Sequence, residues 1–151
     1  MQVILEDLAG KRVVVTAGGS GIGKVVATRF AEAGSLVHVC DGVEDYLSVL
    51  QQEHPEIGVS VADVSSQSDV KELFAEARTD LGGLDILVNN AGVAGPDMGL
   101  EEIEYEDWCH TLDVNLTGTF LCSREAIPLL KQQGRGCIVN MSSNVGLHGL
   151  L

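Results

Sequence analysis

The chain has 151 residues, of which 45% are hydrophobic and 21% charged, and its formal net charge is −13. This length predicts a single domain, residues 1–151, large enough to bury a core. The acidic balance argues against nucleic acid or an anionic membrane as a partner, because both bind clustered Lys and Arg.

The apolar runs of the sequence are only strand-sized, so neither an export signal nor a membrane span is expected. The cysteines show no CxxC spacing, and we expect them to be reduced core thiols of a cytoplasmic protein rather than metal ligands. They are Cys40, Cys109, Cys122 and Cys137.

Short β-branched runs alternate with stretches whose apolar residues recur at helical spacing. The predicted strands are residues 12–16, 35–41, 57–62, 84–88 and 137–141. The predicted helices are residues 21–34, 43–53, 66–81, 101–110 and 113–133, and residues 142–151 are predicted as a loop. Ser65 or Ser66 is the expected cap of the third helix, and Pro128 is a candidate for a kink in the fifth. This order predicts an α/β fold: a doubly wound parallel sheet with right-handed crossovers, truncated after its fifth strand.

The first predicted strand ends in a glycine-rich turn, Thr16-Ala17-Gly18-Gly19-Ser20-Gly21-Ile22-Gly23. Gly21 and Gly23 lack a Cβ, so the backbone can approach a diphosphate and the helix can pack closely on the strand. Unpaired N–H groups and the helix dipole favour an anion there. A glycine pattern alone often marks only a tight turn, but a strand before it and a helix after it favour a dinucleotide such as NAD.

Asp41 ends the second predicted strand. An acidic residue at this place can accept hydrogen bonds from the adenosine ribose hydroxyls, and it repels a 2′-phosphate. No Arg or Lys lies between Asp41 and Glu53 to offset that repulsion. NAD is therefore favoured over NADP, and the alternative interpretation of Asp41 is a solvated loop carboxylate.

Further polar residues follow the third, fourth and fifth predicted strands, at the edge where ligands bind in open α/β folds. They are Asp63, residues 89–92 (Asn-Asn-Ala-Gly), Ser142 and Ser143. Each alone could be ordinary turn chemistry, but their coincidence along one edge favours a site. Asn115 is placed inside a predicted helix, where Asn is mildly disfavoured; its amide is either functional or simply exposed.

The acidic run from Glu101 to Asp107 is interpreted as a solvated helix face. No His is spaced to complete a metal cluster with it, although His110 lies nearby, and His148 is interpreted as a solvent-exposed loop residue. No metal site is expected.

Taken together, these segments resemble the short-chain dehydrogenase/reductase family, in its order and spacing across nearly the whole chain. The matching segments are residues 16–23, Asp41, 63–64, 89–92, 113–118 and 138–143. One departure is Ala17, where the family more often has Gly, and which is tolerable if Ala17 keeps a negative φ. The resemblance implies a Rossmann-type NAD(P)-binding domain and an NAD(P)-dependent oxidoreductase. Its reaction would be hydride transfer between the nicotinamide and a carbonyl or secondary alcohol of a small molecule.

The resemblance also implies a role for particular residues. The diphosphate would lie on Ser20, Gly21, Ile22 and Gly23, the adenosine ribose on Asp41, and the adenine on Asp63 and Val64. Asn90 would lie near the inner ribose. Ser143 would be the catalytic serine that polarises the substrate carbonyl, and Asn115 would position a water in a proton relay.

The family's acid/base pair, a Tyr-x-x-x-Lys motif beyond the serine, has no counterpart in these 151 residues. The tyrosines are Tyr46 and Tyr105, and the last lysine is Lys131. A Lys charge is what lowers the pKa of such a Tyr toward working pH. We therefore expect an incomplete short-chain dehydrogenase domain that is inactive alone; the alternative is a non-catalytic dinucleotide-binding module or a truncated gene product. A full-length relative is expected to form a homo-oligomer, and the substrate stays open.

Overall fold

The computed structural model describes residues 6–143, which form a five-stranded parallel sheet of order β3-β2-β1-β4-β5. The strands are β1 (Arg12–Thr16), β2 (Leu36–Asp41), β3 (Gly58–Val61), β4 (Ile86–Asn89) and β5 (Cys137–Asn140). The helices are α1 (Gly21–Glu32), α2 (Glu44–Glu53), α3 (Gln67–Leu81), α4 (Tyr105–Leu112) and α5 (Gly118–Gln132). The predicted doubly wound α/β fold is confirmed. The predicted loop lies mostly outside the described residues, as does His148.

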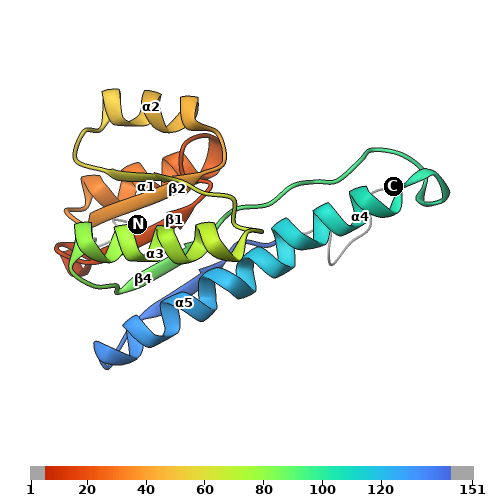
Figure 1. Ribbon diagram of the computed structural model, residues 1–151. Helices are drawn as coiled ribbons and strands as arrows, with labels where there is room; N and C mark the ends of the chain where they lie inside the picture. Colours follow the sequence, from red (N-terminus) through yellow and green to blue (C-terminus); the bar gives the residue numbers. More distant parts are fainter. Residues whose placement is uncertain (1–5, 144–151) are drawn as a thin grey trace.

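Helices cover both faces of the sheet, with α1 and α2 on one side and α3 and α5 on the other (Figure 1). The central strand β1 contributes side chains to the hydrophobic cores on both faces of the sheet, because successive side chains of a strand point to opposite faces. Val13 and Val15 pack toward α1 and α2, and Val14 packs toward α3 and α5. All three are fully buried, as expected for a strand of a parallel sheet.

Local signals fix the ends of α3. The Ser66 hydroxyl accepts a hydrogen bond from the Asp69 N–H at the start of the helix, so Ser66 rather than Ser65 is the cap. Gly82 follows the last turn in a left-handed conformation. Between these ends, Val70, Leu73 and Ala77 face the sheet at helical spacing.

The predicted start of the fourth strand is wrong by two residues, because β4 begins at Ile86 rather than at Leu84. Asp85 does not join the ladder. Its N–H donates to the Arg12 carbonyl, and its carboxylate accepts from the Arg12 main chain and guanidinium. Residues 84–88 are apolar except for Asp85, and the pairing of Asp85 could not be predicted locally because it depends on a residue more than seventy positions away.

The helices predicted over 101–110 and 113–133 are not separate. Leu100–Glu102 form a short 3₁₀ turn, Ile103 and Glu104 are extended, and α4 then continues into α5 through a π-helix at Asp113–Thr117. Glu102 accepts a hydrogen bond from the Gly99 N–H, which holds the 3₁₀ turn apart from α4. The result is one long rod from Tyr105 to Gln132 that extends beyond the sheet (Figure 1).

The four cysteines are free thiols, but they are not all core residues. Cys40 and Cys122 are buried, and burial raises the pKa of both thiols. Cys109 is half-buried and Cys137 is exposed on β5, so the expectation of core thiols is wrong for Cys137. In the part of the chain that the structure describes, no helix is both long and apolar enough to cross a bilayer.

Candidate functional site

The glycine-rich turn connects the carboxyl end of β1 to α1. Gly23 is buried at the first turn of α1, and a Cβ there would collide with the Ala17 carbonyl oxygen and the Asn90 side-chain nitrogen. Ser20, Gly21 and Ile22 precede it at the helix start, where N–H groups have no partner within the helix. The turn thus has the shape and polarity of an anion cradle.

Ala17 adopts a φ of 49° in this turn. The condition under which Ala was considered tolerable here, a negative φ, is therefore not met. The chain must reverse sharply between the end of β1 and the start of α1, and that reversal holds Ala17 in the left-handed region in spite of its Cβ.

Thr16 and Asn90 join the glycine turn to the loop after β4. The Thr16 hydroxyl oxygen accepts from the N–H groups of Asn90 and Ala91, each at 2.9 Å. In return, the Asn90 amide nitrogen donates to the carbonyls of Thr16 and Ala17, at 3.0 and 3.2 Å. Asn90 therefore fixes the conformation of the glycine turn, and its N–H groups are already used in these bonds.

Asp41 ends β2 beside the glycine turn and is only 8% exposed. Its two carboxylate oxygens accept from the N–H groups of Gly19 and Val43, both at 3.1 Å. Each oxygen keeps a further lone pair, so the carboxylate is oriented and can still accept a hydroxyl. A Cβ on Gly19 would lie 2.8 Å from the Tyr46 Cβ, so Tyr46 packs against the same turn.

Asp63 and Val64 follow β3, and their side chains point to different surroundings. The Asp63 carboxylate is exposed and accepts from the Ser65 N–H and hydroxyl at 2.8 and 2.7 Å. Val64 is buried in the core, where it closes on Gly118 of α5. Asp63 can offer its side chain to a ligand at this edge, whereas Val64 can offer only its main chain.

Asn115 stands in the middle of the π-helix between α4 and α5. Both polar atoms of its side-chain amide bind the main chain of Val93. Oδ1 accepts from the Val93 N–H at 2.9 Å, and Nδ2 donates to the Val93 carbonyl at 2.8 Å. Local π-helices commonly occur at functional sites. Here the π-helix aligns Asn115 with the loop after β4, so the Asn115 side chain positions that loop.

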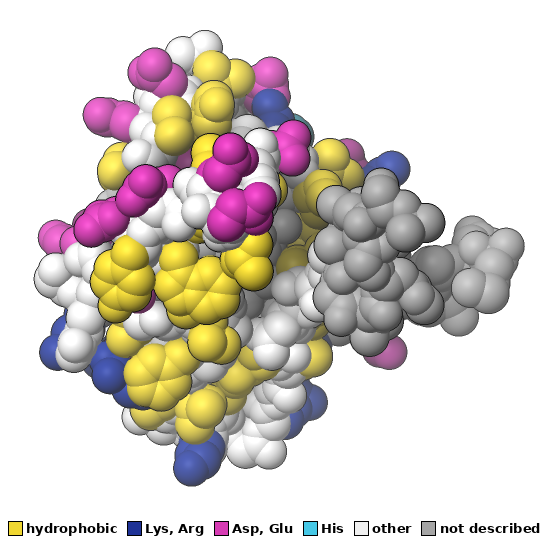
Figure 2. Space-filling model, turned by 90° about the vertical axis from the view of Figure 1, so that its right-hand side faces the viewer, with side chains coloured by type: hydrophobic (Ala, Val, Ile, Leu, Met, Phe, Trp, Pro, Cys, Tyr) yellow, Lys and Arg dark blue, Asp and Glu magenta, His cyan; other side chains and the backbone are white. Residues whose placement is uncertain are grey.

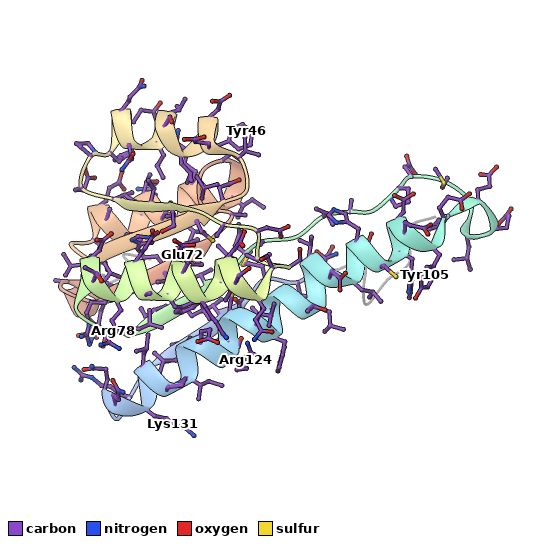
Figure 3. All side chains as sticks on the ribbon, in the orientation of Figure 1. Tyr46, Glu72, Arg78, Tyr105, Arg124 and Lys131 are labelled. Carbon is purple, nitrogen blue, oxygen red and sulfur yellow. The ribbon has the colours of Figure 1, made fainter. Side chains whose placement is uncertain are left out.

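Ser142 and Ser143 follow β5 and line a cleft of ≈ 440 Å³ with Met141, Asn115 and residues 90–93. The cleft thus lies at the carboxyl edge of β4 and β5, next to the glycine turn. Tyr46 lies on α2 and Tyr105 at the start of α4 (Figure 3). Within residues 6–143, neither tyrosine nor any lysine lines this cleft.

The acidic residues from Glu101 to Asp107 are exposed, as predicted for a solvated face. Among residues 6–143, no group of three or more His, Cys, Asp or Glu side chains is arranged to hold a metal ion.

Sequence reasoning missed two parts of this site. The role of Thr16 has a visible signal, a hydroxyl at the end of an otherwise apolar strand. The role of Val93 has none, because its contribution is main-chain and depends on where the π-helix places Asn115.

The sheet order, the glycine turn and the acidic end of β2 define a doubly wound α/β protein with a glycine-lined cradle at its carboxyl edge, where ligands bind in such folds. The sequence profile of the family described as short chain dehydrogenase matches residues 11–151. The chain belongs to this family.

Curated relatives cover nearly all of the chain. A 3beta-hydroxysteroid dehydrogenase from Mediterraneibacter gnavus is 39% identical over 143 residues, 92% of this chain and 51% of the relative. A 2-dehydro-3-deoxy-L-rhamnonate dehydrogenase (NAD(+)) from a Sphingomonas species is 35% identical over 149 residues, 99% of this chain and 60% of the relative. The chain therefore spans little more than half the length of these relatives.

Solved structures show the same architecture. A 3-ketoacyl-(acyl-carrier-protein) reductase from Brucella melitensis, complexed with NADH, has a TM-score of 0.87 at 33% identity; the match covers 91% of this chain and 59% of that one. An NAD⁺-bound xylitol dehydrogenase has a TM-score of 0.88 at 29% identity, with 95% and 56% covered.

Proposed function

We propose that this chain forms the NAD-binding part of an oxidoreductase acting on a small-molecule carbonyl or secondary alcohol. The observation that carries the proposal is the cradle at the carboxyl edge, where Gly23 leaves room for a diphosphate and Asp41 presents an oriented carboxylate. Two similar structures hold NADH or NAD⁺, and one relative is named as an NAD(+) dehydrogenase. These likenesses support NAD as the cofactor.

The residues of the cradle divide the binding of NAD between them. Ser20, Gly21, Ile22 and Gly23 hold the diphosphate with main-chain N–H groups at the start of α1. Asp41 accepts from the adenosine ribose hydroxyls and repels a 2′-phosphate, which favours NAD over NADP. Asp63 and the main chain of Val64 border the adenine.

The bound nicotinamide supplies the hydride acceptor or donor. Asn90 holds the wall of the cleft beside it through Thr16. Ser143 lines the cleft, and we propose that its hydroxyl donates to the substrate oxygen and polarises the carbonyl. Asn115 shapes the cleft through Val93 and belongs to the proposed proton relay.

We propose that the 151-residue chain by itself binds NAD but turns over little substrate. The supporting observation is that no tyrosine or lysine of residues 6–143 lines the cleft to act as the acid/base. Steady NADH production from a panel of secondary alcohols by the purified chain would contradict this proposal, and it would leave the assignment of the cradle intact.

Calorimetric titration with NAD and NADP tests the cofactor assignment. We expect the chain to bind NAD more tightly than NADP. Because hydrogen bonds to a charged group contribute about 1.5–3 kcal/mol, Asp41→Ala should weaken NAD binding by about 10- to 150-fold. Asp45→Ala removes a nearby exposed carboxylate on α2 and serves as the matched control. Equal affinity for the two cofactors, or an unchanged affinity for NAD in Asp41→Ala, would count against the proposal.

We also propose that the protein associates with a second copy of itself through the rod formed by α4, the π-helix and α5. Large apolar side chains are exposed along it at spacings of three and four residues, which place them near one face. They are Tyr105, Trp108, Leu112, Leu116 and Phe120. An apolar surface of this kind marks an interaction site.

Four unpaired thiols favour a reducing, cytoplasmic location, which subcellular fractionation can check.

A further inference from the structure

A chain of polar contacts joins β2, β3 and α3 on the face of the sheet covered by α3. Its two middle residues, His38 and Ser60, are buried, and its two end residues, Asp80 and Glu76, are exposed. His38 of β2 is only 1% exposed, and its Nδ1 lies 2.8 Å from the Asp80 carboxylate. Its Nε2 lies 2.7 Å from the Ser60 hydroxyl of β3. The same hydroxyl contacts the Glu76 carboxylate. The network therefore runs Asp80–His38–Ser60–Glu76, and we call it the His38 network.

The backbone around the network is fitted to it. Gly58 pairs with His38 in the sheet, and a Cβ on Gly58 would lie 2.6 Å from His38 Nδ1 and 2.8 Å from the Asp80 carboxylate. The titratable groups that act on His38 are Asp80 and Glu76, both on α3. Its partners in register on β1 and β3, Val14 and Gly58, are uncharged.

The arrangement does not suit nucleophilic catalysis, although it contains a serine, a histidine and an aspartate. Ser60 is 5% exposed, so a substrate cannot reach its oxygen.

Each of the three contacts needs one hydrogen between its two heavy atoms. A neutral imidazole supplies one N–H, the Ser60 hydroxyl supplies one O–H, and ionised carboxylates supply none. Two protons cannot make three hydrogen bonds. The missing proton can reside on the imidazole or on the carboxyl group of Asp80 or Glu76, and the count is the same in each case.

We propose that the His38 network holds one proton beyond those of a neutral imidazole and ionised carboxylates, and that it is a pH-sensitive link between the sheet and α3. Loss of this proton leaves one of the three contacts without a hydrogen. Burial lowers the pKa of the His38 imidazole, against the opposing charge of Asp80.

Glu76→Gln tests the count, because a glutamine amide is a donor at every pH. Its N–H can donate to Ser60, Ser60 to His38 Nε2, and His38 Nδ1–H to Asp80, so three contacts form without an extra proton. We expect the folding equilibrium constant of the wild type, divided by that of Glu76→Gln, to fall as pH rises. If the folded wild type holds one proton that the unfolded chain has lost, this ratio falls tenfold per pH unit. The fall begins above about pH 4.3, the ordinary pKa of a glutamate in an unfolded chain.

The measurement is urea denaturation of the full chain from pH 5 to 8, followed by circular dichroism. Glu72→Gln is the matched control, because Glu72 is exposed one turn earlier on α3 (Figure 3). The folding equilibrium constant of the wild type, divided by that of Glu72→Gln, should stay constant from pH 5 to 8. In a Ser60→Ala background, which removes the middle of the network, the Glu76→Gln ratio should also become independent of pH.

A ratio for Glu76→Gln that stays constant from pH 5 to 8 in the wild-type background would overturn the proposal. So would a pH dependence that survives Ser60→Ala, because the proton would then belong to a site outside the network. Once the ratio has shown the extra proton, nitrogen NMR of the His38 ring locates it. A doubly protonated ring places it on the imidazole, a ring protonated only on Nε2 places it on Asp80, and a ring protonated only on Nδ1 places it on Glu76.

Discussion

Ala17 carries a conformational cost that its glycine neighbours do not. At a φ of 49°, a residue with a Cβ is destabilised by about 1–2 kcal/mol. Replacement by Gly removes this cost but adds roughly 0.5–1 kcal/mol of backbone entropy to be lost on folding. We expect Ala17→Gly to raise the free energy of unfolding by up to about 1 kcal/mol, measured by urea denaturation.

Ala75→Gly is the control for this prediction. Ala75 is an exposed residue within α3, where Gly should lower the free energy of unfolding by about 0.5–1 kcal/mol. If both substitutions destabilise the protein equally, the left-handed conformation of Ala17 costs nothing, and the physical account of the turn is wrong.

Between elements, the Arg12–Asp85 pair joins the amino ends of β1 and β4. Both side chains are largely buried, and three hydrogen bonds of 2.8–3.0 Å lower the pKa of Asp85. A carboxylate with a lowered folded-state pKa stabilises the protein above its ordinary pKa, and that stability is lost as pH falls through the folded-state value. We therefore expect Asp85→Asn to cost about 1–3 kcal/mol near neutral pH and progressively less in acid.

Denaturation of the two proteins from neutral pH down to about pH 2 measures this convergence, since the ordinary pKa of Asp is about 3.9. Asp97→Asn, at an exposed position in the loop after β4, should leave the pH profile parallel to that of the wild type. A constant difference between the wild type and Asp85→Asn down to pH 2 would show that the charge of Asp85 is not what stabilises the pair.

The sequence predicted those elements whose signals are local. The apolar run of β1, the cap Ser66 and the glycine turn each lie within a few residues of what they determine. The start of β4 and the joining of α4 to α5 could not be predicted, because Arg12 and Val93 act on them from distant positions. The φ of Ala17 could not be predicted, because the preference of a residue with a Cβ is overridden there by the turn.

The candidate site divides in the same way. Asp41 could be placed at the carboxyl edge from its position after a strand, and the structure puts it beside the glycine turn. The bidentate contact of Asn115 with Val93 and the His38 network were missed, since each needs three-dimensional pairing of segments far apart in the chain.

At the scale of the whole molecule, the rod exposes large apolar side chains along one face. In Figure 2 the molecule is viewed from the α4 end of the rod, and hydrophobic side chains are gathered on this face. We expect the chain to sediment as a dimer or larger, and Trp108→Glu with Phe120→Glu to yield monomers, because a carboxylate at a packed apolar interface is costly to desolvate. Analytical ultracentrifugation provides the measurement.

Val49→Glu is the control for this prediction, since Val49 is an exposed apolar residue on α2, away from the rod. It should leave the sedimentation coefficient unchanged. A wild-type chain that is monomeric at high concentration would contradict the prediction.

The central position of β1 in the sheet also predicts the order in which the strands unfold locally. Val13, Val14 and Val15 are fully buried and paired on both sides, whereas β5 is partly exposed and, within residues 6–143, pairs on one side only. Amide hydrogens should therefore exchange last in β1 and much earlier in β5. The glycine turn follows β1, the strand expected to exchange last. Ser142 and Ser143 follow β5, which is expected to exchange much earlier. In that order of opening, a partly opened molecule would keep its glycine turn in place after the Ser142 and Ser143 hydroxyls had left the cleft.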